Sequence, residues 1–116
     1  MTEPEITIEE LGDGVVIVGV AGDLTFANAE RLARELHAAL DAGAVRLVVD
    51  VSDVGFMDSA GLAALLRAAT KARRSDAAVA LVHEPAGPPR ILHFKGVEQL
   101  MRMFGSREQA LAAPGA

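Results

Sequence analysis

Two nearly continuous apolar runs constrain the fold of this chain more than any other feature. Residues 15–21 and 47–51 each predict a strand covered on both faces, because a half-exposed strand alternates apolar and polar residues. Between these runs, leucine at four-residue spacing predicts an amphipathic helix over residues 26–40. Two buried strands joined by one helix imply a right-handed crossover and parallel pairing. An α/β fold is therefore expected.

Shorter patterns predict the remaining elements. Residues 6–9 alternate like a half-exposed strand, and Asp13-Gly14 is a hairpin signal, so the first two strands should be antiparallel neighbours. Residues 22–25 are expected to end the second strand. The other expected elements are a loop over 52–58, a helix over 60–73, a strand over 77–82, a short helix over 89–94 closed by Gly96, a strand or helical turn at 100–104, and a helix over 106–113 with capping-box spacing.

Together these elements predict one domain over residues 1–116, with a mixed sheet of four or five strands. About four helices should form a single layer, packed mainly on one face of the sheet. Binding sites in such sheets favour the carboxyl ends of the parallel strands. Two segments meet that description, residues 22–28 and 52–61.

Composition excludes several function classes. The absence of cysteine excludes disulfides and thiolate chemistry and fits a reducing, cytoplasmic location. A net charge of −5 with 3% aromatic residues argues against a nucleic-acid partner. No apolar run approaches the roughly 18 residues that span a bilayer, and the polar N-terminus does not predict a signal peptide.

Known cofactor, metal and catalytic motifs are also missing. The three histidines, His37, His83 and His93, fall on different predicted elements and predict no metal site. No glycine-rich nucleotide loop and no nucleophile elbow occurs, so no cofactor and no enzymatic activity are expected. A phospho-receiver domain is rejected because the hairpin leaves no helix after the first strand. Asp50 is instead expected to anchor the following loop through hydrogen bonds.

The segment 56–62 carries the strongest functional signal. Phe56 and Met57 are expected to pin the loop to the core, and Asp58 or Ser59 suits the N-cap of the next helix. Capping is one interpretation of Ser59, and phosphorylation is the other, because a helix N-terminus accommodates a phosphate. Thr25 in the earlier segment allows the same two interpretations, a turn residue or a second phosphorylation site.

Residues 49–62, Val-Asp-Val-Ser-Asp-Val-Gly-Phe-Met-Asp-Ser-Ala-Gly-Leu, resemble the signature of STAS-domain anti-sigma factor antagonists, and element order and chain length match as well. The resemblance implies a protein that binds an anti-sigma factor of the serine kinase type. Phosphorylation of Ser59 would end that binding, and a serine phosphatase would restore it. It also implies a protein that is monomeric when free. The partner-binding residues implied are Asp23, Thr25, Asn28, Met57, Asp58, Ser59, Ala60, Gly61 and Leu62.

Two features depart from the antagonist pattern. The family usually has Ser or Thr where Ala60 stands, and many members carry a second acid where Thr25 stands. Residues 26–31 are instead similar to the STAS domains of sulfate-type anion transporters. An alternative function therefore stays open: a non-switching scaffold or sensor module of a transporter or stress-signalling complex that binds a small ligand or nucleotide.

Overall fold

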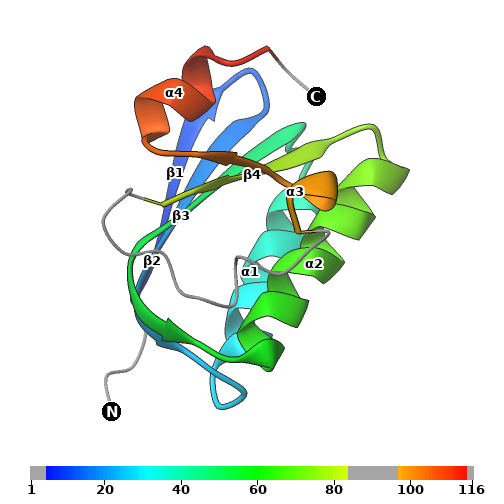
Figure 1. The fold of residues 1–116 in the computed structure, drawn as a ribbon. Helices are drawn as coiled ribbons and strands as arrows, with labels where there is room; N and C mark the ends of the chain where they lie inside the picture. The colour runs from blue at the N-terminus through cyan, green and yellow to red at the C-terminus, as the bar shows by residue number, and fades with distance from the viewer. Residues whose placement is uncertain (1–4, 84–96, 115–116) are drawn as a thin grey trace.

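The computed structural model describes residues 5–83 and 97–114 (Figure 1). Its sheet has five strands in the order β1-β2-β3-β4-β5, with β1 antiparallel to β2 and the other neighbours parallel. The strands are β1 (Glu5–Gly12), β2 (Val15–Leu24), β3 (Arg46–Met57), β4 (Ala78–Val82) and β5 (Arg102–Phe104). The helices of the described residues are α1 (Ala29–Asp41), α2 (Ser59–Arg74), α3 (Val97–Leu100) and α4 (Arg107–Ala112). The predicted α/β fold with a mixed sheet is confirmed.

The hairpin between β1 and β2 forms at the predicted dipeptide. Asp13 and Gly14 have φ angles of 55° and 77°. Positive φ at both central residues is the conformation that a tight two-residue hairpin requires, and its twist matches that of the flanking strands. The hairpin makes β1 an edge strand, and most of its residues are exposed.

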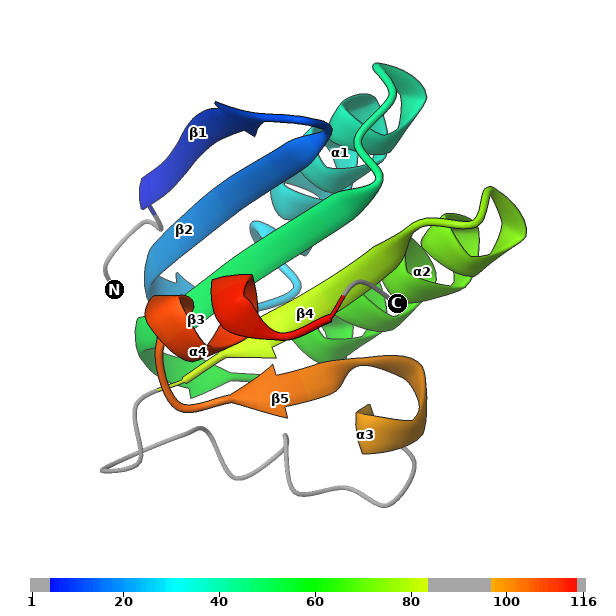
Figure 2. The same ribbon diagram turned by 90° about the horizontal axis from the view of Figure 1, so that it is seen from above.

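The two long helices pack side by side on one face of the sheet (Figures 1 and 2). The main core lies between them and the sheet, and its fully buried members include Val18, Leu32, Leu36, Leu47, Leu65 and Leu81. The short helix α4 lies on the opposite face, over a smaller cluster of Ile17, Val48, Ala80, Val82 and Ala110. The predicted placement of the helices mainly on one face therefore holds for the long helices, while α4 covers part of the other face.

The strands extend further than the sequence predicted. β2 continues through Leu24, and β3 includes residues 52–57, which were expected to form a loop. β3 pairs with β2 through two register shifts, each of which places one extra residue in β3. Buried side chains consequently fall at Val51, Val54 and Met57, three residues apart. This spacing hides the strand in the sequence, because a strand is recognised by a period of two.

Helix α1 begins at Ala29 rather than at the predicted Phe26. The side chain of Asn28 holds the preceding residues in a turn: its Oδ1 accepts the N–H of Thr25 at 2.9 Å, and its Nδ2 donates to the carbonyl of Asp23 at 2.9 Å. The hydroxyl of Thr25 accepts the N–H of Ala27 at 3.3 Å, which confirms the turn role predicted for Thr25. These side-chain bonds compete with helix formation.

The C-terminal elements largely follow the sequence. The segment expected to be a strand or a helical turn contains both, as the end of α3 and all of β5. Ser106 caps α4 by accepting the N–H of Gln109 at 3.1 Å, as the capping-box spacing predicts. The short helix predicted over residues 89–94 lies outside the described residues.

Candidate functional site

The two segments expected to form a site meet at the carboxylate of Asp58. Its Oδ1 accepts the N–H of Gly61 at 3.0 Å and thereby caps α2. Its Oδ2 accepts the N–H of Phe26 at 2.9 Å, from the loop between β2 and α1. The backbone N–H of Asp58 donates in turn to the carbonyl of Leu24 at 3.1 Å. One side chain therefore fixes the start of α2 and the neighbouring loop against each other.

These hydrogen bonds favour the ionised form of Asp58. The N–H of Gly61 has the largest effect on the pKa of Asp58 and lowers it. Burial has the next largest effect and raises the pKa, but the N–H of Phe26 also lowers it, so the pKa lies below its usual value. A negative charge at this position is also favoured by the positive end of the α2 dipole. The site therefore presents a fixed carboxylate at neutral pH.

Ser59 is the first residue of α2 and is exposed. The cap is supplied by Asp58, and the Ser59 hydroxyl makes no hydrogen bond to any residue in the described part of the chain. Of the two candidates for the cap, Asp58 is the one that performs it. The Ser59 hydroxyl is left accessible to solvent, at a helix end that accommodates a phosphate.

Three of the residues named for partner binding lie in the interior. Met57, Gly61 and Leu62 are buried, and Leu24 packs beside them. A Cβ added at Gly61 would lie 2.7 Å from the Leu24 carbonyl oxygen and 2.9 Å from Cγ of Met57. Only glycine permits this close approach of α2 to β2. These residues support the site from beneath and set the position of Asp58 and Ser59.

Two aromatic side chains are exposed on the segments that meet at Asp58. Phe26 is 81% exposed and Phe56 is 56% exposed. The prediction that Phe56 pins its segment to the core is wrong, because β3 continues to Met57 and its register shift between Val54 and Met57 leaves Phe56 on the exposed side. Met57 is buried as predicted. Exposed phenylalanines suit contact with a partner, and sequence reasoning missed both as surface residues.

The remaining residues predicted to bind a partner are half-buried. Asp23 is half-buried and brings a second carboxylate to the Phe26 loop, whereas Asn28 and Thr25 hold that loop in its turn. Ala60 faces α1, where it packs against a small cluster of Ala29, Ala33 and Ala64. Ala60, where the antagonist family usually has Ser or Thr, thus lies at a contact between the two long helices.

Asp50 forms a separate polar cluster on the sheet. Its Oδ1 accepts the N–H and the hydroxyl of Ser52 at 3.0 and 2.6 Å, and its Oδ2 pairs with Nε of Arg107 at 2.6 Å. Burial raises the pKa of Asp50, but the bonds from Ser52 and Arg107 outweigh it and lower the pKa overall. The predicted anchoring of the following residues is confirmed, and the Arg107 bond also ties α4 to the sheet.

The histidines give no indication of a metal centre. Within residues 5–83 and 97–114, no group of three or more His, Asp or Glu side chains is placed to hold a metal ion. His37 lies on α1, His83 follows β4, and His93 lies outside the described residues. No helix in the described part of the chain is long and apolar enough to cross a membrane.

Comparison with known proteins assigns the family. The family model described as "Mlab, STAS domain" matches residues 8–105. The BtrV protein of Bordetella bronchiseptica, named as a candidate anti-sigma factor antagonist, is 30% identical over 109 residues, which cover 94% of this chain and 93% of BtrV. The chain belongs to the STAS-domain family. Within that family it is related to the anti-sigma factor antagonists, as the sequence signature indicated.

Solved structures share the fold. A crystal structure of an anti-sigma factor antagonist from Mycobacterium paratuberculosis has a TM-score of 0.78 at 23% identity, over 94% of this chain and 92% of that one. The Bacillus cell-fate determinant SpoIIAA in its phosphorylated form has a TM-score of 0.71 at 19% identity, over 92% and 96% of the two chains. The murine anion transporter Slc26a9 matches with a TM-score of 0.65 at 27% identity, over 84% of this chain and 17% of the transporter. The predicted similarity to transporter STAS domains is therefore confirmed as well.

Proposed function

We propose that this chain is an anti-sigma factor antagonist that regulates transcription by partner switching. In its unphosphorylated form it binds an anti-sigma factor that is also a serine kinase, and the sigma factor is released. The kinase phosphorylates Ser59, the complex dissociates, and a serine phosphatase resets the switch. The chain acts as a binding protein and kinase substrate and not as an enzyme. It works in the cytoplasm, is monomeric when free, and contacts neither nucleic acid nor membrane directly.

The exposed hydroxyl of Ser59 is the observation that carries this proposal. The N-cap of α2 is already occupied by the neighbouring carboxylate of Asp58, so modification of Ser59 breaks no hydrogen bond of the described structure. A phosphate there meets the positive end of the helix dipole, which favours it, and the ionised Asp58, which repels it. The fold is thus expected to survive phosphorylation while the surface charge changes.

The surroundings of Ser59 explain how the added charge would end binding. Phe26 and Phe56 offer exposed apolar area on the two segments joined at Asp58, and a partner that covers them must exclude water from the Ser59 region. A phosphate adds about −1.5 to −2 charges at neutral pH. An uncompensated charge enclosed in such an interface costs about 2–5 kcal/mol, enough to dissociate a complex of ordinary affinity.

Phosphorylation by the cognate kinase, mapped by mass spectrometry, tests the proposal. We expect one phosphate, on Ser59, and no incorporation into Ser59→Ala. Ser59→Ala should bind the anti-sigma factor as the unmodified chain does, whereas Ser59→Glu should bind more weakly. Phosphate on another residue with Ser59 unmodified would overturn the assignment of the site, and Thr25→Ala serves as the matched control for the second hydroxyl in the region.

A second candidate function follows from the likeness to the transporter Slc26a9 and from the turn over residues 25–28. In that case the chain is a non-switching scaffold or sensor module of a transporter or a stress-signalling complex, with a small ligand or nucleotide as its effector. Affinity capture of interacting proteins from the source cells distinguishes the two. A small anti-sigma factor kinase supports the switch, and a membrane transporter or a large assembly supports the scaffold.

A further inference from the structure

An open groove of about 680 Å³ lies between the β1–β2 hairpin and the last turns of α1. Helix α1 is the nearer of the two long helices to β1, the edge strand of the sheet (Figure 2). Val15 at the hairpin and Leu24 beside Asp58 are the two ends of β2, whose 10 residues span about 30 Å. The groove therefore lies at the opposite end of the sheet from Ser59.

The walls of this groove are small or apolar. Helix α1 contributes Ala38, Ala39 and Ala42, and β1 contributes Ile8. Ile6 packs against the main core, and Ile8, two residues on and therefore on the same face of β1, is 48% exposed. The layer formed by α1 and α2 thus leaves this part of β1 uncovered, and the alanines of α1 would let another backbone approach closely.

Both charged side chains that line the groove are acidic, Glu10 from β1 and Glu35 from α1. Neither pairs with a cation within the described residues. The C-terminal end of α1 borders the groove, and its last turn holds no basic residue to offset the negative end of the helix dipole. An apolar surface is therefore framed by negative charge alone.

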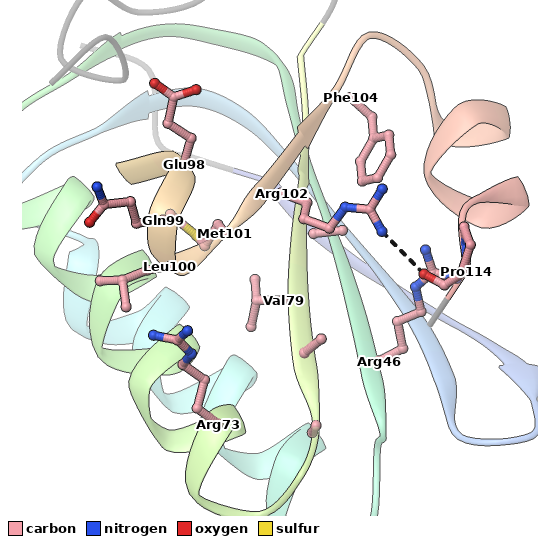
Figure 3. Close-up of a pocket in the computed structure, with 13 residues that line it drawn as sticks. Arg46, Arg73, Val79, Glu98, Gln99, Leu100, Met101, Arg102, Phe104 and Pro114 are labelled. Atoms are coloured by element: carbon pink, nitrogen blue, oxygen red, sulfur yellow. Dashed lines mark hydrogen bonds between the residues drawn. The ribbon is translucent and has the colours of Figure 1, made fainter. Parts of the chain in front are cut away.

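The smaller cavity between α2 and β5 has no such arrangement (Figure 3). Arg73 lies on the α2 side of the sheet, whereas Arg46 and Arg102 lie on the α4 side and donate to the carbonyls of Ala110 and Pro114. The cations of that cavity do not converge, whereas the charges around the groove share one sign and one hollow.

From this arrangement we infer that the groove docks a basic amphipathic helix of a partner protein. The helix lies over β1 beside α1 and extends the layer of α1 and α2. Apolar side chains along one of its faces cover Ile8 and the alanines, as in other complexes that place a helix in a groove. Its Lys or Arg side chains pair with Glu10 and Glu35, whereas an acidic helix would bring like charges together. This inference does not depend on the proposed partner switch.

Nuclear magnetic resonance titration of the full ¹⁵N-labelled chain tests the inference. The probe is a helical peptide of two heptads Lys-Leu-Ala-Lys-Leu-Leu-Lys, and the control peptide has Glu in place of every Lys. We expect saturable shifts of the amides of Ile8, Ala38 and Ala42 with the basic peptide and none with the acidic one. The amides of Ser59 and Gly61 should not shift. Absence of saturation, equal shifts with the acidic peptide, or shifts centred on Ser59 would overturn the inference.

Two matched pairs of variants in β1 locate the binding. Glu10→Gln should weaken binding of the basic peptide about threefold, the effect of one exposed ion pair, whereas Glu9→Gln removes the same charge outside the groove and should not. Ile8→Thr should weaken it about tenfold through lost apolar contact. Leu11→Thr, at a position 45% exposed and outside the groove, should leave the affinity unchanged. Equal affinities within either pair would contradict the docking of the peptide in this groove.

A dilution series of the chain without peptide tests a second copy as the occupant. We expect the amides of Ile8, Ala38 and Ala42 to keep their positions at every concentration. Movement of these amides on dilution would assign the groove to self-association and overturn the inference.

Discussion

The carboxylate of Asp58 accepts the backbone N–H of Phe26 at 2.9 Å, across 32 residues of sequence. This bond joins the loop before α1 to the start of α2, and both segments carry residues expected to contact a partner. The other oxygen of Asp58 caps α2 through Gly61. The positions of Phe26 and Ser59 relative to each other are therefore set by one side chain.

Substitution of Asp58 separates its two roles. Asp58→Asn can still cap α2 through its amide oxygen, but its NH₂ group cannot accept the N–H of Phe26. Asp58→Ala loses both bonds. We expect the thermal midpoint to fall more for Ala than for Asn, and amide shifts around Phe26 in both variants. Asp53→Asn, an exposed position in β3, is the control. Equal midpoints for all three variants would contradict the assigned roles.

Gly61 is expected to tolerate no side chain. Gly61→Ala places a methyl group 2.7 Å from the Leu24 carbonyl oxygen, so α2 or β2 must shift, at a cost of about 1–3 kcal/mol in the free energy of unfolding. At Gly55 the nearest atom to an added Cβ is Oδ1 of Asp23 at 3.6 Å, an ordinary contact. Urea denaturation of Gly61→Ala and Gly55→Ala measures the difference. Equal stability of the two variants would show that the approach of α2 to Leu24 is not tight.

Ser59→Ala should leave stability almost unchanged, within about 0.5 kcal/mol, because Ser59 is exposed and Asp58 supplies the cap. Urea denaturation of this variant beside the unmodified chain checks the expectation. A loss above about 1 kcal/mol, the typical value of a cap, would show that the hydroxyl stabilises the helix start.

The exposed phenylalanines should contribute to binding and not to folding. Phe26→Ala removes a side chain that is 81% exposed, so its effect on the unfolding free energy should be within about 0.5 kcal/mol. Met57→Ala, at a position 3% exposed, should cost about 2–5 kcal/mol. Calorimetric titration with the partner should show weaker binding by Phe26→Ala by about 1–4 kcal/mol. Unaltered affinity in both Phe26→Ala and Phe56→Ala would place the partner elsewhere.

The pair of Asp50 and Arg107 predicts a pH dependence of stability. Although burial raises the pKa of Asp50, its bonds to Ser52 and Arg107 lower it below the usual value of 3.8. Ionised Asp50 thus stabilises the folded chain above pH 3.8, and this contribution disappears as the pH falls from 3.8 through the folded-state pKa. The stability difference between the unmodified chain and Asp50→Asn should be largest at neutral pH and shrink in acid. A difference that stays constant with pH would contradict this.

Sequence patterns were sufficient wherever the signal is local. The paired φ > 0 residues at Asp13 and Gly14, the leucine stripe of α1 and the cap at Ser106 depend on neighbours a few residues away, and all three form as predicted. The signature around Ser59 identified the family for the same reason, because its residues are contiguous.

Tertiary structure decided what depends on pairing between distant segments. Residues 52–57 form strand and not the expected loop because they pair with β2. The bulges that this pairing requires turn Phe56 outward. The Asp58–Phe26 bond likewise joins groups from two elements that are distant in the sequence. The sequence by itself determined the order of the elements and the family, since both are encoded in local spacing. Only the folded chain decided which side chains the site exposes, because exposure depends on the strand register.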